Sequence, residues 1–577
     1  MSDVGRGVPP LPAALPLSAP PAFPGGAPDE QALARLMTEL FRAMPGNADP
    51  STPPAWLDAP ATGLAPVASA PAVPAPEPWL PVRGGQAGGF GAPLPGGPPP
   101  TVPPLTDAIP DVAVLAARFA LPRTPAVPVG APLYFLTEAT PPAGRVPAGP
   151  RAAPTASPSA PPLASTNHSA FDAHRYRQDF PILNERVNGR PLVWLDNAAT
   201  TQKPQSVIDR LVHYYRHENS NIHRAAHELA ARSTDAYEAA RESLRRFINA
   251  GSVDEIVFVR GATEAINLVA QSWGRKSLTA GDEIVITWLE HHANIVPWQR
   301  VAAETGARLR VVPVDDRGQI LLDEYERLLG PRTKLVALTQ VSNALGTVTP
   351  ARAMVEMAHR HGARVLVDGA QAVSHMRTDV RALDADWYVL SGHKMFGPTG
   401  IGVLYGRKDL LDAMPPWQGG GNMIKDVTFE QTEYHAAPAR FEAGTGNIAD
   451  AVGLGAAVDY LERVGMEAIA HHEHALLVHG TRLLEAVPGL RPVGTAAEKA
   501  GVLSFVLEGL TPLEVGQALN REGIAVRAGH HCAQPILRRF GLEATVRPSL
   551  AFYNTFEDLD VLAAALHRIR SRAPLRR

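Results

Sequence analysis

A chain of 577 residues is too long for one compact domain, and a formal net charge of −3 argues against a protein that binds nucleic acid through a basic surface. Its single cysteine excludes an internal disulfide framework and a cysteine-cluster metal site. Met1 to Pro10 contains no cationic segment that leads into an apolar core, and no apolar stretch is long enough to span a bilayer. We therefore expect a cytoplasmic protein that acts on a small molecule and binds neither membrane nor nucleic acid.

The first 167 residues have an unusual composition. They contain 39 of the 56 prolines, and the first lysine of the chain is Lys203. A region so rich in proline, alanine and glycine cannot build regular hydrogen-bond ladders or a sizeable core. We therefore expect residues 1–167 to form a mostly disordered extension.

Three short apolar segments interrupt this extension, at about residues 29–46, 107–122 and 131–137. The first has helical spacing after the capping residue Asp29, and its apolar side chains are Leu33, Leu36, Met37, Leu40, Phe41 and Met44. Short apolar segments on a disordered tether are typical of regions that fold onto a partner. The alternative is that they fold back onto the chain's own catalytic domain.

From about His168 the composition becomes ordinary. Apolar strands alternate with amphipathic helices there, which is the pattern of an α/β fold. We expect a segment at 168–190 that packs on a small domain, a large domain at 191–461 and a small α+β domain at 462–577. In a doubly wound sheet, the C-terminal ends of the strands of the large domain would face one crevice.

Two strand ends in the large domain carry a lysine and an aspartate. Lys394 follows the strand-like run 387–390, and Asp368 ends a second buried strand at 364–368. Alone, an aspartate at a strand end is usually a turn former, and a lone lysine is usually a solvated charge. A desolvated lysine has a lowered pKa and a reactive amine. On adjacent strands, the two side chains would suit pyridoxal 5′-phosphate (PLP), which needs an amine for its Schiff base and a carboxylate beside its pyridine nitrogen.

Other strand ends carry groups that fit such a cofactor. The turn at Ala262 and Thr263 opens a helix whose free N–H groups suit a phosphate, although the Walker spacing is absent. The adjacent pair His291 and His292 has no acidic or cysteine partner at ligand spacing, so an imidazole stacked on an aromatic ring is favoured over a metal site. Asn343 lies on the loop after a further strand.

The small domain holds the only cysteine of the chain, Cys532, on a Gly-His-His loop. A lone cysteine is more often an inert buried residue than a nucleophile. On this loop, however, neighbouring imidazoles favour the reactive thiolate. Further along, Arg547 is suited to a two-point contact with a carboxylate.

Together these motifs resemble the group II, Suf-type cysteine desulfurases, which are homodimeric PLP enzymes of fold type I and of aminotransferase class V. The resemblance covers residues 168–577 and implies a large mixed-sheet domain followed by a smaller α+β domain. The stretches that carry it are Leu195-Asp196-Asn197-Ala198-Ala199-Thr200, Asn221-Ile222-His223-Arg224, Glu290-His291-His292-Ala293-Asn294, Asp368-Gly369-Ala370-Gln371, Ser391-Gly392-His393-Lys394, Phe441-Glu442-Ala443-Gly444-Thr445 and Gly529-His530-His531-Cys532.

The resemblance implies a role for each matching residue. Lys394 would form the Schiff base and act as the base at the substrate Cα, and Asp368 would pair with the pyridinium. Cys532 would carry the sulfur. His291 would stack on the cofactor ring and, with Lys394 and Cys532, would be one of the catalytic residues. Further cofactor contacts are implied for Ala262, which stands where relatives often have threonine, and for Thr263, Gln371, Ser391, His393 and, from the other protomer, Thr445. Substrate contacts are implied for Arg547 and Asn343, with His223 and Arg224 reaching in from the dimer mate.

The implied reaction converts L-cysteine to L-alanine and leaves a persulfide on Cys532. A sulfur acceptor protein or a reductant would then remove that sulfur, for iron–sulfur cluster assembly or for storage. The extension at 1–167 resembles the cargo segment of desulfurases packaged in type 2 encapsulin shells. Two alternatives stay open: a selenocysteine lyase or other PLP eliminase on the same scaffold, and a scaffold or cargo protein with a vestigial PLP site.

Overall fold

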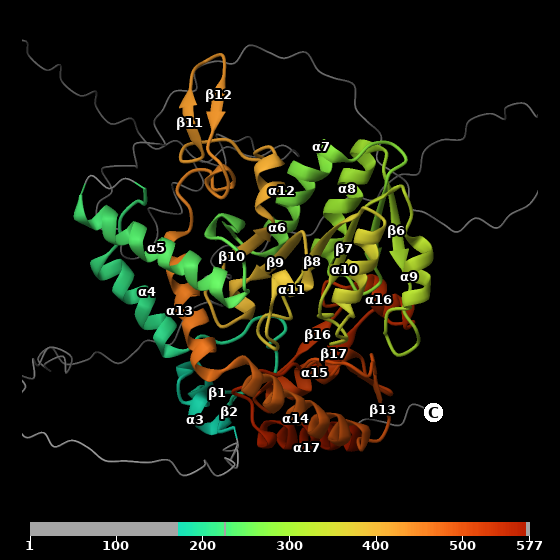
Figure 1. The fold of residues 1–577 in the computed structure, drawn as a ribbon. Coiled ribbons are helices and arrows are strands. Elements are labelled where there is room, and N and C mark those ends of the chain that lie inside the picture. The colour runs from blue at the N-terminus through green and yellow to red at the C-terminus, as the bar shows by residue number, and fades with distance from the viewer. Residues whose placement is uncertain (1–170, 224–226, 573–577) are drawn as a thin grey trace, which may run out of the picture. The chain divides into compact units, whose positions relative to one another are not determined.

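The computed structural model describes residues 171–223 and 227–572 (Figure 1). Its centre is a seven-stranded mixed sheet in the order β4-β10-β9-β8-β7-β5-β6. Neighbouring strands run parallel except at β10, which is antiparallel to β4 and β9. The strands are β4 (Ile256–Val259), β5 (Glu283–Thr287), β6 (Arg308–Val312), β7 (Thr333–Thr339), β8 (Arg364–Asp368), β9 (Trp387–Ser391) and β10 (Gly402–Gly406). The predicted α/β fold with a mixed sheet is confirmed, whereas the extension at 1–167 and its three apolar segments lie outside the described residues.

The two faces of the sheet bury different residues of the same strands. Val336 and Leu338 of β7 pack into one apolar cluster, and Leu335 and Ala337 pack into another. Because both faces are covered, β5, β8 and β9 are near-continuous apolar runs rather than alternating ones.

Helices form the outer layers (Figure 1). The cluster on one face takes residues from α4 (Gln205–His217), α5 (Glu228–Phe247), α9 (Leu322–Leu328), α10 (Ala351–Arg360), α11 (Val380–Leu383) and α13 (Ile448–Val464). The cluster on the other face takes residues from α6 (Ala262–Val269), α8 (Val296–Thr305) and α12 (Lys408–Ala413). A π-helical turn, Ala270–Gly274, joins α6 to α7 (Arg275–Ser277).

Several strands of the sheet end at one edge. Thr339, the last residue of β7, pairs with Asp368, the last residue of β8, and Asp368 pairs in turn with Val389 of β9. Parallel neighbours therefore deliver the residues that follow β5, β7, β8 and β9 to the same side, as expected of an α/β sheet.

A smaller antiparallel sheet follows in the chain, in the order β13-β14-β17-β16. Its strands are β13 (Leu490–Pro492), β14 (Phe505–Leu507), β16 (Arg527–Gly529) and β17 (Thr545–Arg547), and its helices are α14 (Met466–Glu485), α15 (Pro512–Arg521), α16 (Gln534–Arg539) and α17 (Phe556–Arg572). Together they bury a separate apolar cluster. A short parallel pair, β15 (Ile524–Ala525) with β3 (Val193–Trp194), links this region to the start of the large one.

The first described residues pack on the small sheet's helices. Arg177 of α3 (Ala173–Arg177) pairs with Asp558 of α17 at 3.0 Å, and the ring of Phe171 stacks on His472 of α14. The two-residue strands β1 (Arg186–Val187) and β2 (Arg190–Pro191) pair with each other after α3.

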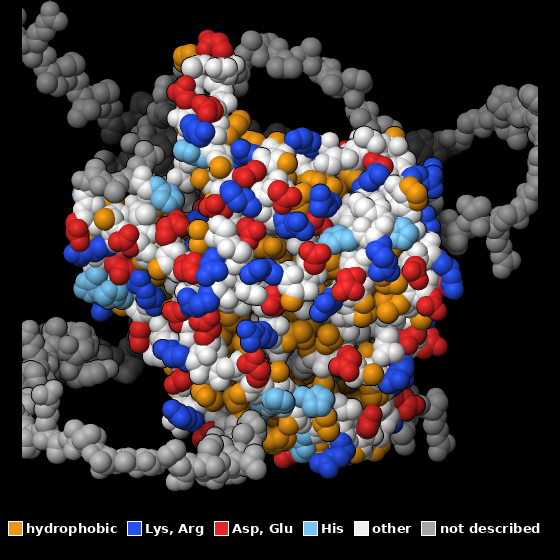
Figure 2. Space-filling view, in the orientation of Figure 1, with side chains coloured by type: hydrophobic (Ala, Val, Ile, Leu, Met, Phe, Trp, Pro, Cys, Tyr) orange, Lys and Arg blue, Asp and Glu red, His pale blue; other side chains and the backbone are white. Residues whose placement is uncertain are grey.

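A β-hairpin of β11 (Ile424–Val427) and β12 (Thr432–Tyr434) stands away from the body, with a fully exposed Phe429 between its strands (Figure 1). On the face shown in Figure 2, Lys and Arg side chains are interspersed with Asp and Glu side chains, in keeping with the small net charge. Among residues 171–223 and 227–572, no helix has the length and apolar character needed to cross a membrane.

Candidate active site

A cavity of about 180 Å³ opens at the edge where the strands of the large sheet end. Residues from both parts of the protein line it, so the small sheet closes the crevice that the large sheet begins. Its lining residues are Ala198, Ala199, Ala262, Thr263, His291, Ala293, Asn343, Asp368, Ala370, Ser391, His393, Lys394, Arg527, His531, Cys532 and Arg547.

Lys394 and Asp368 lie in this cavity from adjacent strands. Lys394 ends the 3₁₀ turn Gly392–Lys394 that follows β9, and burial lowers the pKa of its amine to about 8, although the charge of Asp368 acts in the opposite direction. Burial likewise raises the pKa of Asp368, whose Oδ1 accepts a hydrogen bond from the backbone N–H of Ala370 at 2.9 Å. A reactive amine and a carboxylate therefore share one desolvated space.

Thr201 holds the turn that carries Lys394. Its backbone N–H donates to the carbonyl of His393 at 3.0 Å, and its Oγ1 accepts from the N–H of Phe396 at 2.7 Å. The hydroxyl of Thr200 donates to the same carbonyl of His393 at 3.0 Å. The backbone on both sides of Lys394 is thus fixed by a segment almost two hundred residues earlier in the chain.

The start of α6 lies beside Ser391. Ser391 Oγ accepts from the N–H of Ala262 at 2.9 Å, and a Cβ at Gly261, whose φ is 154°, would lie 3.3 Å from the same oxygen. Thr263 and His393 line the cavity next to this helix end. A helix N-terminus with small residues and hydroxyls around it is suited to a phosphate.

His291 is held as a neutral imidazole. Its Nδ1 accepts from the N–H of Ala293 at 3.0 Å, and burial lowers its pKa to about 3, helped by the charge of Lys394. A neutral ring in this position can stack on an aromatic cofactor without adding charge to it.

The loop of the cysteine has a constrained backbone. His531 and Cys532 are consecutive residues with positive φ, 54° and 53°, which is uncommon for residues other than glycine and is typical of functional sites. Two hydrogen bonds from the large sheet's loops fix it: Asn343 Nδ2 donates to the carbonyl of His531 at 2.6 Å, and the N–H of His292 donates to the carbonyl of Cys532 at 2.8 Å. The cysteine is therefore held at the cavity from outside its own domain.

Arg547 is buried in the cavity wall at the end of β17. Its Nη1 donates to the carbonyl of Asn343 at 2.9 Å, and its Nη2 donates to Asp196 Oδ1 at 3.1 Å. Its Nε is buried and has no hydrogen-bond partner among residues 171–223 and 227–572, and the same holds for Asn343 Oδ1. These two unpaired polar atoms mark a place where a polar ligand would be bound.

The structure does not bring every predicted residue to this cavity. Gln371 is buried, and its Nε2 donates to the carbonyl of Ala198 at 2.7 Å. Thr445 is exposed and lines a different cavity of about 560 Å³, and His223 is exposed and contacts Glu238 at 3.1 Å. Arg224 lies outside the described residues.

Sequence reasoning missed several residues that shape the site. Arg527 lines the cavity, Asp196 binds Arg547, His292 holds the cysteine loop and Thr201 holds the lysine turn. Asp196 and Thr201 could have been found from the sequence, because they begin and end an unusual stretch of polar and small residues, 196–201. No pattern in the sequence pointed to Arg527.

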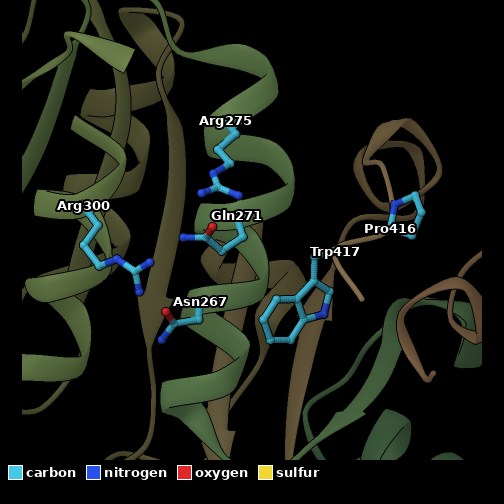
Figure 3. Close-up of a pocket in the computed structure, with 6 residues that line it drawn as sticks. All are labelled: Asn267, Gln271, Arg275, Arg300, Pro416 and Trp417. Atoms are coloured by element: carbon cyan, nitrogen blue, oxygen red, sulfur yellow. The ribbon is translucent and has the colours of Figure 1, made fainter. Parts of the chain in front are cut away.

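A second cavity, of about 350 Å³, lies along the helix that begins at the active site (Figure 3). Asn267, Gln271 and Arg275 lie along that helix, with Arg300 on one side and Trp417 on the other. Arg275 already pairs with Glu304 at 2.6 Å, and both charged side chains of the lining are exposed. None of the described residues that line this cavity is a nucleophile or a buried acid.

The residues of the active site fit PLP. An amine of lowered pKa, a buried carboxylate on the next strand, a neutral imidazole and a helix N-terminus beside hydroxyls are the groups that this cofactor requires. The fold and the site define a PLP-dependent enzyme of fold type I.

Comparisons with known proteins agree with this assignment to the PLP-dependent enzymes. The aminotransferase class-V family matches residues 193–562. A cysteine desulfurase from Synechococcus elongatus is 74% identical over 414 residues, which cover 71% of this chain and 66% of that protein. A protein from Mycobacterium leprae named "Probable cysteine desulfurase 1" is 59% identical over 522 residues, covering 88% of this chain and 84% of the relative. The crystal structure of the cysteine desulfurase CsdA from Escherichia coli superposes with a TM-score of 0.65 at 39% identity, over 70% of this chain and 99% of that chain.

The chain therefore belongs to the aminotransferase class-V family and, within it, to the PLP-dependent cysteine desulfurases.

Proposed function

We propose that this chain converts L-cysteine to L-alanine as a Suf-type desulfurase and keeps the sulfur as a persulfide on Cys532. The observation that carries the proposal is that the only cysteine of the chain lines the same cavity as Lys394 and Arg547. A thiol that lay outside this cavity would not support a role in the reaction.

Each residue has a role in this reaction that its surroundings support. When bound, PLP supplies an electron sink for chemistry at the substrate Cα. Arg547 binds the substrate carboxylate, and the Lys394 amine removes the Cα proton and returns a proton to carbon. The Cys532 thiolate attacks the substrate sulfur: an S–S bond forms, the Cβ–S bond breaks, and its electron pair stays with the carbon, which is protonated to give alanine.

The proposed reaction is tested with Cys532→Ala in the full chain. The variant should keep bound PLP but form almost no alanine from L-cysteine. Because the wild type has no other thiol, a mass increase of one sulfur on the intact protein reports the persulfide directly. Undiminished alanine formation by the variant would contradict the nucleophile role, and L-selenocysteine as comparison substrate tests the lyase alternative.

The active protein is proposed to be a homodimer in which Thr445, His223 and Arg224 complete the site of the other protomer. The exposure of Thr445 and His223 and their absence from the cavity lining support contributions in trans. Mixed dimers of Lys394→Ala and Thr445→Ala protomers test this. If Thr445 acts in trans, each mixed dimer has one intact site and should bind one PLP as tightly as the wild type. If the mixed dimers bind PLP no better than Thr445→Ala alone, Thr445 does not act in trans.

The extension at 1–167 is proposed to dock the enzyme inside an encapsulin shell through its three apolar segments. The match to the Mycobacterium leprae protein covers 88% of the chain, and residues 168–577 are only about seven tenths of it, so this relative shares part of the extension. Several weak segments on one tether would bind together through effective concentration, and a dimer would present two tethers.

Deletion of residues 1–167 separates docking from catalysis. The truncated enzyme should retain its desulfurase activity and lose copurification with a shell protein from its native cells. If it copurifies as before, or if it unfolds, the extension does not act as a docking segment.

A further inference from the structure

Glu290 is a fully buried carboxyl group that the proposed reaction does not use. It lies between the end of β5 and His291. Its Oε1 accepts from the hydroxyl of Thr287 at 2.6 Å and from the backbone N–H of Thr339 at 3.0 Å, and its Oε2 accepts from Asn294 Nδ2 at 2.6 Å. No Lys, Arg or His of the described residues forms an ion pair with it. Burial raises its pKa to about 8, against the effect of these hydrogen bonds.

The amide of Asn294 has only one possible orientation. The indole Nε1 of Trp298, which can only donate, donates to Asn294 Oδ1 at 2.9 Å. Asn294 Nδ2 must therefore point to Glu290, so Oε2 is an acceptor whether or not the carboxyl group carries a proton. The N–H of Thr339 can also only donate, so Glu290 Oε1 accepts this hydrogen bond in either protonation state.

This hydrogen-bond chain joins the elements that carry the cofactor residues. It connects the end of β5, the end of β7 and the start of α8 across the turn on which His291 stands. Thr339 pairs in the sheet with Asp368. Glu290, which directly precedes His291, is therefore hydrogen-bonded to the strand residue that pairs with Asp368.

We propose that Glu290 is a positioning residue of the PLP site, which acts through His291 and Asp368 by accepting from three donors at the joined ends of β5 and β7. The inference rests on the proposed function for the identity of the cofactor-binding residues. It concerns cofactor binding and not sulfur transfer.

Two single substitutions and their combination test the proposal. In Glu290→Gln, the new amide nitrogen takes the place of one of the two carboxylate oxygens. It then faces either Asn294 Nδ2 or the N–H of Thr339, so in either orientation two N–H donors point at each other. In Asn294→Asp, two carboxyl groups face each other, and above pH 8, where Glu290 is ionised, neither has a proton to donate to the other. In the double variant Glu290→Gln/Asn294→Asp, the amide nitrogen introduced at position 290 would donate to the carboxylate introduced at position 294. That carboxylate would still accept from Trp298, so every donor again has an acceptor.

The measurement is the dissociation constant for PLP of the full-length protein at a pH above 8, where Glu290 is ionised, and thermal unfolding of the apo-protein is measured under the same conditions. Each single variant should bind PLP about tenfold or more weakly, because a buried polar group is left without a partner. The double variant should recover most of this loss, and Glu304→Gln, which breaks an exposed pair with Arg275, should bind PLP like the wild type.

If Glu290→Gln binds PLP as tightly as the wild type, or if the double variant is no better than the weaker single variant, the proposal is wrong. If the single variants do not fold, recovery of folding in the double variant supports the hydrogen-bond chain, and its PLP affinity still decides the positioning role. A protein that binds PLP in this pattern but forms no alanine would contradict the proposed function and leave this inference intact.

Discussion

Asp196 accepts a hydrogen bond from Arg547, with 3.1 Å between Oδ1 and Nη2. The two residues are far apart in the sequence, and the carboxylate holds a guanidinium whose Nη1 is also bound to the carbonyl of Asn343. Burial lowers the pKa of Arg547 to about 10, and the charge of Asp196 opposes that effect. The guanidinium is therefore fixed in the cavity wall before any substrate arrives.

Arg547→Lys should raise KM for L-cysteine about 10- to 100-fold, because an ammonium group cannot replace a planar two-point donor that Asp196 and Asn343 orient. The amount of bound PLP should stay as in the wild type. Steady-state alanine formation gives KM and kcat, and the visible absorbance of PLP gives the occupancy. An unchanged KM at full occupancy would show that the substrate carboxylate binds elsewhere.

The lowered pKa of Lys394 predicts a pH dependence for cofactor uptake. An amine must be unprotonated to react with an aldehyde, so the rate at which the apo-protein takes up PLP should rise with pH and level off above about pH 8. Below this pKa the amine is protonated, and the rate should fall about tenfold per pH unit. Stopped-flow absorbance measures the rate, and Lys394→Ala should lack the absorption of covalently bound PLP. A midpoint near the ordinary lysine pKa would contradict the buried position of the amine.

Thr201→Val should weaken the turn of Lys394, because valine has nearly the same shape but can neither accept from Phe396 nor donate to His393. The N–H of Phe396 would lose its partner in a buried place, which costs about 1 to 3 kcal/mol of the free energy of unfolding. Thr201→Ser keeps the hydroxyl and is the matched control. Urea unfolding of the two apo-proteins measures the difference. A valine variant as stable as the wild type, or no less stable than the serine variant, would show that the Thr201 hydroxyl does not hold the turn.

Gly369→Ala should destabilise the protein because a Cβ there would collide with Cζ and the hydroxyl oxygen of Tyr388. Tyr388 cannot move freely, since it is fully buried and its hydroxyl donates to Gln340 at 2.7 Å. Overpacking of this kind costs about 1 to 3 kcal/mol or more. Gly330→Ala, which meets no atom within 4 Å, is the control. Thermal unfolding measures the stability of both variants. Equal stability would show that the turn after β8 can adjust to the added Cβ, against this prediction.

Much of the fold follows from local patterns. The apolar runs before Asp368 and Lys394 predict strands that the structure has, as β8 and β9, and their adjacency as parallel neighbours is confirmed. Buried parallel strands leave this signal because both of their faces need apolar side chains. The positions of the extension's apolar segments stay predictions, since those residues lie outside the described part of the chain.

The sequence alone determined which chemical groups this protein has and which strand ends carry them: one thiol, a lysine and an aspartate after buried strands, and a helix that opens beside small residues. Only the tertiary structure decided which distant residues hold those groups in place, such as Thr201 at the lysine turn, Asn343 and His292 at the cysteine loop, and Glu290 between two strand ends. The physical reason is that strand and helix patterns depend on neighbours along the chain. A hydrogen bond between segments far apart in sequence depends on how the whole sheet is ordered, and no local pattern records that order.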